Sequence, residues 1–451
     1  MSPSPQLARK LRLTDYFTLG WGTMVGVGWL VVMDDWLGRG GSLGAILGFA
    51  IGGALLLPIG YVYAQLVMAM PDAAAEIAYT AKVFPAPLSF ATGWMMVLAY
   101  FIVCPWEAVA IGRIAGYILP GLNSVPLYTI AARPVYLPHL LLGLAATAVI
   151  TFLNYRGIGT SARFQNWTAF TTLALFVVFV SVGAASGSVG NFPPLFSGNG
   201  VFISIFLVIQ IVPYFMTGFE SVAKVAEEAR PDLRSHEFFV AIMLAILVGI
   251  VFYTAVIAAV ALAARWNTLR TTPLLTAVAF QQGIGSRWIV RIILAAALVS
   301  LVKVFNGNFV AASRLVFALG RGGWVDRRLS TIHPRNQTPS IAVVSTGVAT
   351  AAAMFLGQAL LIPVTEVGSV ASATGWLAAS AAYYAMRPTG GKRLISALGI
   401  VIALAMILMK IVPALPGHFN RYEWMALALW VLLGIILSAR EKAVKRADRT
   451  R

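Results

Sequence analysis

Ionisable side chains interrupt several long apolar stretches of the chain, and they are the first candidates for chemistry. Glu107, Glu220 and Lys303 lie within such stretches, and Asp34 and Asp35 lie near the end of another. A charged side chain at the centre of a bilayer costs about 2.5–3.5 kcal/mol on insertion scales, so each one requires a partner or a function. In apolar surroundings, carboxylates and an ammonium group can bind protons, form ion pairs or contact a charged solute.

Other kinds of chemistry lack the residues that they need. Cys104 is the single cysteine, so no disulfide can form within the chain. The four histidines are far apart and show no metal-ligand spacing. No nucleophile–base spacing is evident either. We therefore expect no enzyme, no cofactor and no metal site.

The composition is typical of a membrane protein. Of the 451 residues, 59% are hydrophobic and 11% are charged, whereas soluble proteins have about 25% charged residues. A membrane-spanning helix needs about 20 apolar residues, and runs of this length recur along the whole chain. We therefore expect an all-α polytopic membrane protein with about twelve transmembrane helices. The expected spans are roughly 15–38, 44–70, 88–118, 138–155, 165–186, 202–223, 237–264, 288–318, 339–357, 360–386, 394–413 and 422–439.

The positive charge of the chain indicates its orientation in the membrane. The formal net charge is +17, but Lys and Arg fall mainly in the gaps between spans, which argues against a nucleic-acid partner. Placing both termini in the cytoplasm puts most of them on the inner side, as the positive-inside rule requires. We expect a bacterial-type inner (cytoplasmic) membrane, one transmembrane domain over residues 1–440, and a basic cytoplasmic tail over residues 441–451 that contacts lipid headgroups. No pattern indicates the oligomeric state.

Two of the expected spans contain helix-breaking residues in their middles. Residues 20–28 are rich in glycine, and residues 213–220 contain Pro213 and Gly218. Unwinding a helix frees backbone N–H and C=O groups, which lipid tolerates only where they line a cavity or bind a ligand. Matching breaks in two halves predict an inverted-repeat transporter with its site near the membrane midplane. The alternative is that the glycines form a packing face between helices.

Four motifs resemble those of the amino acid permeases in the amino acid–polyamine–organocation (APC) superfamily. The run Val25-Gly26-Val27-Gly28-Trp29 is similar to the glycine motif of that family's first helix. Residues 215–231 resemble the family's sixth-helix motif with its acidic end. Residues 154–163 resemble the junction of its helices four and five, and residues 311–323 resemble the end of its helix eight. The similarity covers nearly the whole chain. The motifs are specific for the family and not for a substrate.

The resemblance implies the leucine-transporter fold, with two inverted five-helix repeats (about 15–186 and 202–386) and two further helices (about 394–439). It also implies alternating access around a site between helices 1, 3, 6, 8 and 10. Backbone N–H groups of the first break would bind the carboxylate of the substrate. Carbonyl groups of both breaks would bind its amino group, and an aromatic side chain would cover the substrate. The implied substrate-binding residues are Thr23, Val25, Gly26, Val27, Gly28, Tyr214, Phe215, Thr217 and Gly218.

Glu220 and Lys303 are the candidate coupling residues. Glu220 follows the sixth-helix break, where the resemblance implies a proton-sensing glutamate, although it could instead cap freed N–H groups. Lys303 lies near the position where sodium-coupled members of this fold bind Na⁺. Some proton-coupled relatives place a helix-five lysine there, whereas this chain has Thr172 at that position. We expect Lys303 to supply the cation from helix eight, the alternative being a fixed ion pair with Glu107 or another buried acid.

The remaining acidic residues are candidate gate residues. Asp34 and Asp35 would attract a cationic substrate or form a gate at the external mouth, or would simply be solvated near Arg39. Glu107 must find its partner on another helix or in the vestibule. The other two candidates, Glu227 and Glu228, would form a cytoplasmic gate with Arg156, Arg163 or Arg314, or a solvated helix end.

Together these features predict a secondary active transporter of amino acids that works as a proton-coupled symporter or as an exchanger. The alternative substrates are cationic amines or polyamines, since several acidic residues lie near the expected site. A sodium-coupled transporter is disfavoured by Lys303, and a sensor by the absence of a soluble output domain. The expected partners are therefore a small-molecule substrate, protons and membrane lipids.

Overall fold

The computed structural model of the protein describes residues 6–130, 133–272, 274–285, 287–357 and 361–449. Most of these residues are helical, and the prediction of an all-helical polytopic membrane protein is confirmed. Of the predicted basic tail 441–451, the backbone continues the last helix as far as Arg449, and its side chains lie outside the described part. The domain boundaries remain predictions.

Within the described residues, eight helical segments are long and apolar enough to cross a membrane. They comprise α3 (Met33–Ala69), α5 with α6 (Ala86–Phe101 and Val103–Ile118), α7 (Leu137–Arg156), α8 (Ile158–Ser186), α12 (His236–Ala263), most of α14 (Arg287–Arg321), α17 (Gly391–Ile411) and most of α18 (Arg421–Arg449). Two further helices, α15 (Ser340–Met354) and α16 (Leu361–Ala385), account for the predicted ninth and tenth spans.

The two spans with predicted breaks are divided into short helices. The first consists of α1 (Leu13–Met24), α2 (Gly28–Val31) and the start of α3. The sixth consists of α9 (Val201–Ile209), α10 (Val212–Phe215) and α11 (Ser221–Lys224). Both breaks therefore occur in the segments in which the sequence predicts them.

The boundary between the first two predicted spans lies inside α3, at a bend. Gly41 has φ +70°, a backbone conformation that favours glycine. A Cβ atom at Gly41 would lie 2.6 Å from the carbonyl oxygen of Leu195 and from backbone atoms of Phe196. The bend thus lets the loop before α9 approach the chain closely.

Two short elements differ from the prediction. A two-stranded antiparallel hairpin, β1 (Pro126–Ile130) and β2 (Arg133–Tyr136), occupies the loop before α7. The helix α4 (Glu76–Ala81) lies between the second and third predicted spans, where it packs against α5 and α16, and its Glu76 side chain is fully buried.

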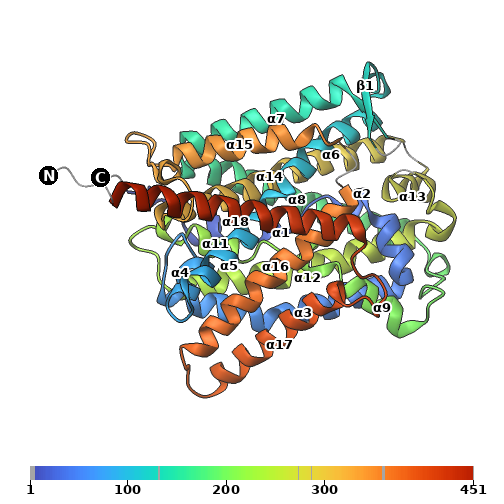
Figure 1. Ribbon diagram of the computed structural model, residues 1–451. Helices are drawn as coiled ribbons and strands as arrows, with labels where there is room; N and C mark the ends of the chain where they lie inside the picture. Colours follow the sequence, from blue (N-terminus) through green and yellow to red (C-terminus); the bar gives the residue numbers. More distant parts are fainter. Residues whose placement is uncertain (1–5, 131–132, 273, 286, 358–360, 450–451) are drawn as a thin grey trace.

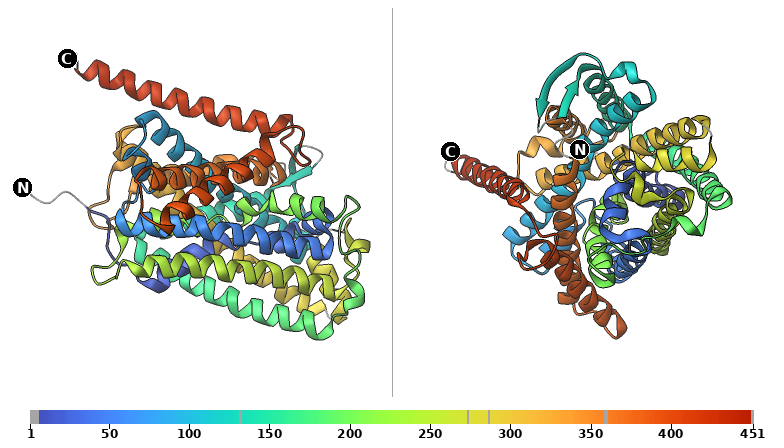
Figure 2. Two further views of the ribbon diagram at one scale, coloured as in Figure 1. Left: turned by 90° about the horizontal axis from the view of Figure 1, so that it is seen from below. Right: turned by 90° about the vertical axis from the view of Figure 1, so that its right-hand side faces the viewer.

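The helices form a bundle in which α1 packs against α8, α12 and α14. Figure 1 shows β1, α9 and α13 (Leu275–Ile284) at one end of the bundle, which we call the outer end. The opposite end, with the segment around 226–230, is the inner end. Figure 2 shows α18 at the periphery of the bundle. The Trp430 ring of α18 stacks on the Trp94 ring of α5, with 4.4 Å between the ring centroids. The indole N–H of each tryptophan donates to the backbone carbonyl oxygen of the other.

Candidate functional site

The two helix breaks lie against each other in the middle of the bundle. Gly218, in the second break, has φ +138°. A Cβ atom at this position would lie 2.5 Å from the backbone nitrogen of Met24 and 2.8 Å from the carbonyl carbon of Thr23, at the end of α1. Only glycine permits both this conformation and this approach. Gly218 therefore brings the two unwound backbones into contact.

The first break is held by donors from α14. The Lys303 ammonium donates to the carbonyl oxygen of Val25 at 2.6 Å and lies 4.3 Å from the centre of the Trp21 ring. The Asn308 side-chain amide donates to the carbonyl oxygen of Thr23 at 3.2 Å. Lys303 and Asn308 are both fully or almost fully buried. The freed carbonyls of this break therefore have a cationic and an amide donor, as buried polar groups require.

The second break is held by an acceptor of its own segment. The Gly218 backbone N–H donates to Glu220 Oε2 at 3.1 Å, and the Glu220 side chain is fully buried. The other oxygen, Oε1, has no hydrogen-bond partner in the described part of the chain. Glu220 thus binds one freed N–H group of the break, and the Tyr100 hydroxyl lies near its carboxylate. Its role in coupling stays a prediction.

Tyr253 on α12 touches both breaks at once. Its hydroxyl oxygen lies 3.0 Å from the carbonyl oxygen of Met24 and 2.9 Å from that of Phe215. Because a hydroxyl carries one hydrogen atom, it donates to one carbonyl at a time. Sequence analysis missed Tyr253, since a tyrosine in an apolar span carries no signal that distinguishes it from a packing residue.

A small cavity lies where the breaks meet. Its walls come from α1, α2, α6, α10 and α14 together with both unwound segments. The lining residues are Thr23, Met24, Gly26, Gly28, Val103, Trp106, Glu107, Tyr214, Phe215, Thr217, Val304 and Asn308. Six of the predicted substrate-binding residues are among them. Of the other three, Val25 binds Lys303, Gly218 joins the breaks, and Val27 is buried beside α2.

Several polar atoms around this cavity lack hydrogen-bond partners. Five buried side-chain atoms have none in the described part of the chain, namely Thr23 Oγ1, Glu107 Oε2, Tyr214 OH, Thr217 Oγ1 and Asn308 Oδ1. Buried polar groups in native proteins are nearly always paired. A polar solute bound in this cavity would supply partners for these five atoms.

Two glycines keep the cavity open. A Cβ atom at Gly26 would lie 3.2 Å from Glu107 Oε1, and one at Gly28 would lie 2.5 Å from the Phe215 ring. Phe215 in turn makes edge contacts with the rings of Trp36 and Tyr214. Side chains at either glycine would occupy space beside the unwound backbone that a solute needs.

The position of Lys303 does not match a fixed ion pair with Glu107. No described ion pair joins these two side chains, and the short contact of Lys303 is with a backbone carbonyl. Thr172, at the corresponding point of α8, donates to the carbonyl oxygen of Thr168 within its own helix. Lys303 is therefore the cationic group that contacts the first break.

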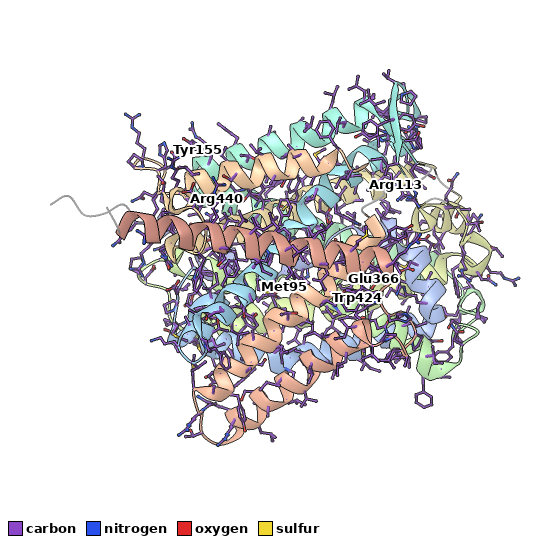
Figure 3. The ribbon with its side chains drawn as sticks, in the orientation of Figure 1. Met95, Arg113, Tyr155, Glu366, Trp424 and Arg440 are labelled. Atoms are coloured by element: carbon purple, nitrogen blue, oxygen red, sulfur yellow. The ribbon has the colours of Figure 1, made fainter. Side chains whose placement is uncertain are left out.

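The outer end carries a chain of ion pairs. Arg39 Nε lies 2.8 Å from Asp35 Oδ2, and Arg39 Nη2 lies 3.0 Å from Glu366 Oε1 on α16. Glu366 also pairs with Lys410 of α17. Asp34 is half-buried and belongs to none of the described ion pairs. Figure 3 shows Glu366 displaced toward the outer end of the helices relative to Tyr155, which lies near the inner end.

The inner end is closed by a second set of ion pairs. Glu228 and Arg314 are both fully buried and lie 3.0 Å apart. The backbone N–H groups of Lys10 and Leu11 donate to the Glu228 carbonyl oxygen, which attaches the segment before α1 to this point. Of the predicted arginine partners, Arg314 is the one that binds Glu228. A solvated helix end, the alternative interpretation, does not fit this buried residue.

Glu227 has a different environment at the inner end. It accepts hydrogen bonds from Arg321 at 2.7 Å and from the Ala73 backbone N–H at 2.9 Å, and Arg321 also binds Asp72. Burial raises the pKa of Glu227, but these hydrogen bonds outweigh burial and hold the pKa below the ordinary value for glutamate. Glu227 is therefore ionised at neutral pH and ties the inner ends of three segments together.

Comparisons with known proteins agree with this architecture. A family model described as amino acid permease matches residues 11–439. The chain is 25% identical to the methylthioribose transporter of Bacillus subtilis (strain 168), over 97% of this chain and 94% of that protein. It is 25% identical to the branched-chain amino acid permease BcaP of the same organism, over 82% of this chain and 78% of that protein.

A plant relative extends the range of substrates among these proteins. The chain is 25% identical to the vacuolar cationic amino acid transporter 4 of Arabidopsis thaliana, over 82% of this chain and 62% of that longer protein. The family model covers nearly the whole chain, and its members are transporters rather than enzymes. The chain is therefore a multi-pass membrane protein that belongs to the amino acid permease family of the APC superfamily.

Proposed function

We propose that the protein is a secondary active transporter that carries amino acids across the cytoplasmic membrane by alternating access. The observation that carries this proposal is the cavity between the two helix breaks, with its five unpartnered buried polar atoms. An amino acid offers a carboxylate and an ammonium group, which match freed N–H groups and carbonyl or hydroxyl oxygens respectively. Such a ligand would pair the polar atoms that the protein alone leaves unpaired.

In this proposal the substrate lies across the contact between the breaks. Its carboxylate would approach the backbone at Gly26, Val27 and Gly28, where the absence of side chains at two positions permits close contact. Its amino group would face the carbonyl and hydroxyl oxygens at Thr23 and Thr217. The Tyr214 and Phe215 rings would cover the ligand from the outer side.

Alternating access requires the two ends of the bundle to open in turn. The ion pairs of Arg39 and Glu366 would open toward the outside, and those of Glu228 and Arg314 toward the cytoplasm. With the inner end and both termini in the cytoplasm, the basic inner loops follow the positive-inside rule. Glu220 and Lys303 are the residues that would couple these movements to protons, because each contacts one break directly.

A second candidate substrate class is a cationic amino acid or an amine. Glu107 is buried in the cavity wall, its Oε2 atom has no partner in the described residues, and no described ion pair neutralises it. The Lys303 charge acts on Glu107 without forming an ion pair with it, so a cationic group on the substrate would neutralise this buried carboxylate more directly. One of the relatives is named as a cationic amino acid transporter.

The experiment that tests the function is thermal stabilisation of the purified protein across amino acids and amines, at two pH values, with and without Na⁺. A ligand that binds only the folded state stabilises it by about 2.7 kcal/mol at a hundred times its Kd. Stabilisation by neutral amino acids supports the first proposal, and stabilisation only by cationic ones or by amines supports the second. Stabilisation by Na⁺ alone would contradict the proposal of a proton-coupled amino acid transporter.

A further inference from the structure

Three buried charges lie together on the inner side of the second break. Lys224, at the end of α11, forms an ion pair with Glu76 of α4, and all atoms of both side chains are shielded from solvent. Glu220 precedes Lys224 by four residues and is equally buried. We call these three residues the inner triad. It joins the unwound segment to a helix that lies outside the two predicted spans with breaks.

Aromatic side chains enclose the inner triad and leave it little access to water. The Tyr63 hydroxyl donates to Glu76 Oε1 at 2.6 Å. The Lys224 ammonium lies 5.4 Å from the centre of the Tyr63 ring and 5.1 Å from that of Tyr100. Around the three charges the titratable groups are Tyr63 of α3, Tyr79 of α4 and Tyr100 of α5, and Asp72 lies next beyond Tyr79. All of the tyrosines are fully buried.

The charges of the inner triad do not balance. Two carboxylates and one ammonium leave a net charge of −1 in a site without solvent. Glu76 Oε2 and Glu220 Oε1 make no regular hydrogen bond in the described part of the chain, and the Tyr100 hydroxyl lies near the Glu220 carboxylate. A buried unpaired charge is strongly unfavourable, and one added proton makes the triad neutral. The proton would add to a free carboxylate oxygen, and no other bond would change.

We propose that the inner triad of Glu76, Lys224 and Glu220 is a binding site for one proton, and that this is the proton carried with the substrate. The proposal rests on the proposed function, because it assigns the coupling ion of that transport cycle to a site. Glu220 connects the triad to the substrate cavity, since its Oε2 accepts from Gly218, which touches the first break. In this assignment the proton resides on the inner triad, and Lys303 contributes to coupling as the charge that holds the first break.

The proposal predicts proton coupling from the charge count of each variant. Glu76→Gln leaves one carboxylate and one ammonium, which are neutral together without a proton. Glu76→Gln combined with Lys224→Met leaves Glu220 alone, which again needs one proton for neutrality. The first variant should therefore lose coupling, and the second should regain it. A merely structural role for Glu76 predicts the opposite order, because the double variant removes more of the network.

The test is substrate accumulation in proteoliposomes under an imposed pH gradient, together with substrate exchange at equal pH on both sides. With one proton per substrate, the wild type accumulates substrate up to about tenfold per pH unit. Glu76→Gln should exchange substrate normally and show no accumulation, and the double variant should recover accumulation. Glu423→Gln, a buried acid at the start of α18, is the matched control and should behave as the wild type.

Two outcomes overturn the proposal: unchanged accumulation by Glu76→Gln, or a wild type that exchanges substrate without any response to the pH gradient. A wild type that binds and exchanges no amino acid or amine would instead contradict the proposed function. In that case the infrared carbonyl band of protonated carboxylic acids still tests the triad in the purified protein. The band should lose intensity in both Glu76→Gln and Glu220→Gln, and an unchanged band in both would refute the site.

Discussion

The two helix breaks have the same kind of backbone but are stabilised by opposite charges. In the first break, Lys303 donates to the carbonyl oxygen of Val25. In the second break, Glu220 accepts from the N–H group of Gly218. The pairing follows from chemistry, since an ammonium can only donate and a carboxylate can only accept. Unwinding a helix frees both kinds of group, and each half of the protein uses a charged side chain for one kind.

This difference has a consequence for the transport cycle. The cation of the first break comes from another helix, so it connects α1 to α14. The anion of the second break belongs to the break itself, and its neighbour Lys224 connects α11 to α4. Loss of the first charge should therefore separate two helices, whereas loss of the second should mainly alter the charge of a local cluster. Four variants test that contrast, and their effects should decrease in the order given.

Lys303→Met should have the largest effect. The variant leaves the Val25 carbonyl without its donor, and a buried polar group without a partner costs about 1–3 kcal/mol. We expect a folded protein whose proton-driven uptake is abolished and whose substrate affinity falls at least tenfold. Uptake of radiolabelled substrate and thermal stabilisation measure both effects. Normal uptake under an imposed pH gradient would remove Lys303 from the mechanism.

Glu220→Gln should have an intermediate effect that is confined to coupling. The glutamine carbonyl oxygen can still accept from the Gly218 N–H, so the shape of the second break is retained. Glu76 and Lys224 remain as a neutral pair. We expect substrate exchange within about threefold of the wild type and no accumulation under a pH gradient, since a retained amide acceptor preserves most of the hydrogen bond. If exchange and accumulation fell together, Glu220 would be a structural group of the break.

Tyr253→Phe should weaken both breaks slightly. It removes the hydroxyl that lies within 3.0 Å of the Met24 carbonyl and 2.9 Å of the Phe215 carbonyl, and it keeps the ring that stacks on Phe49. Loss of one such hydrogen bond costs about 1 kcal/mol. We expect a severalfold loss of substrate affinity without a change in coupling, measured by titration of thermal stability. Unchanged affinity would show that the breaks do not need this bridge.

Arg321→Gln, at the inner end and away from both breaks, should have the smallest effect. Arg321 is about two-fifths exposed, and such ion pairs contribute about 0–1 kcal/mol. The pKa of Glu227 is lower in the folded state, so the stabilisation is present at neutral pH and is lost as the pH falls through that pKa. The difference in melting temperature between the wild type and the variant should therefore become smaller at acidic pH. A deficit that grows as the pH falls would contradict this assignment.

The sequence predicts those parts of the site that depend on local backbone chemistry. Gly26, Gly28 and Gly218 stand in breaker-rich runs inside apolar spans, and the structure has breaks in both runs. Lys303 is conspicuous because a lysine inside an apolar run is rare. The family resemblance, carried by four motifs, is confirmed by the family comparison. These features can be recognised in a single stretch of chain.

Contacts between distant parts of the chain are harder to predict. Glu76 and Lys224 are separated by 148 residues, and each stands at the edge of a span where a solvated charge is the ordinary expectation. They meet only in the folded protein, where α4 packs against α5 and α16 and Glu76 reaches Lys224. Likewise, neither the bridge made by Tyr253 nor the pair of Glu366 with Lys410 has a local pattern that selects it. Such residues depend on tertiary packing.

The most direct test of the central claim is the affinity of Gly26→Leu for the ligand that stabilises the wild type. A leucine here would occupy the space beside Glu107 Oε1 and the unwound backbone. Gly121→Leu is the matched control, because a Cβ atom at Gly121 would meet nothing within 4 Å. We predict that Gly26→Leu folds and shows no measurable stabilisation by ligand, while Gly121→Leu binds as the wild type does. Wild-type affinity in a folded Gly26→Leu protein would contradict a substrate site between the two helix breaks.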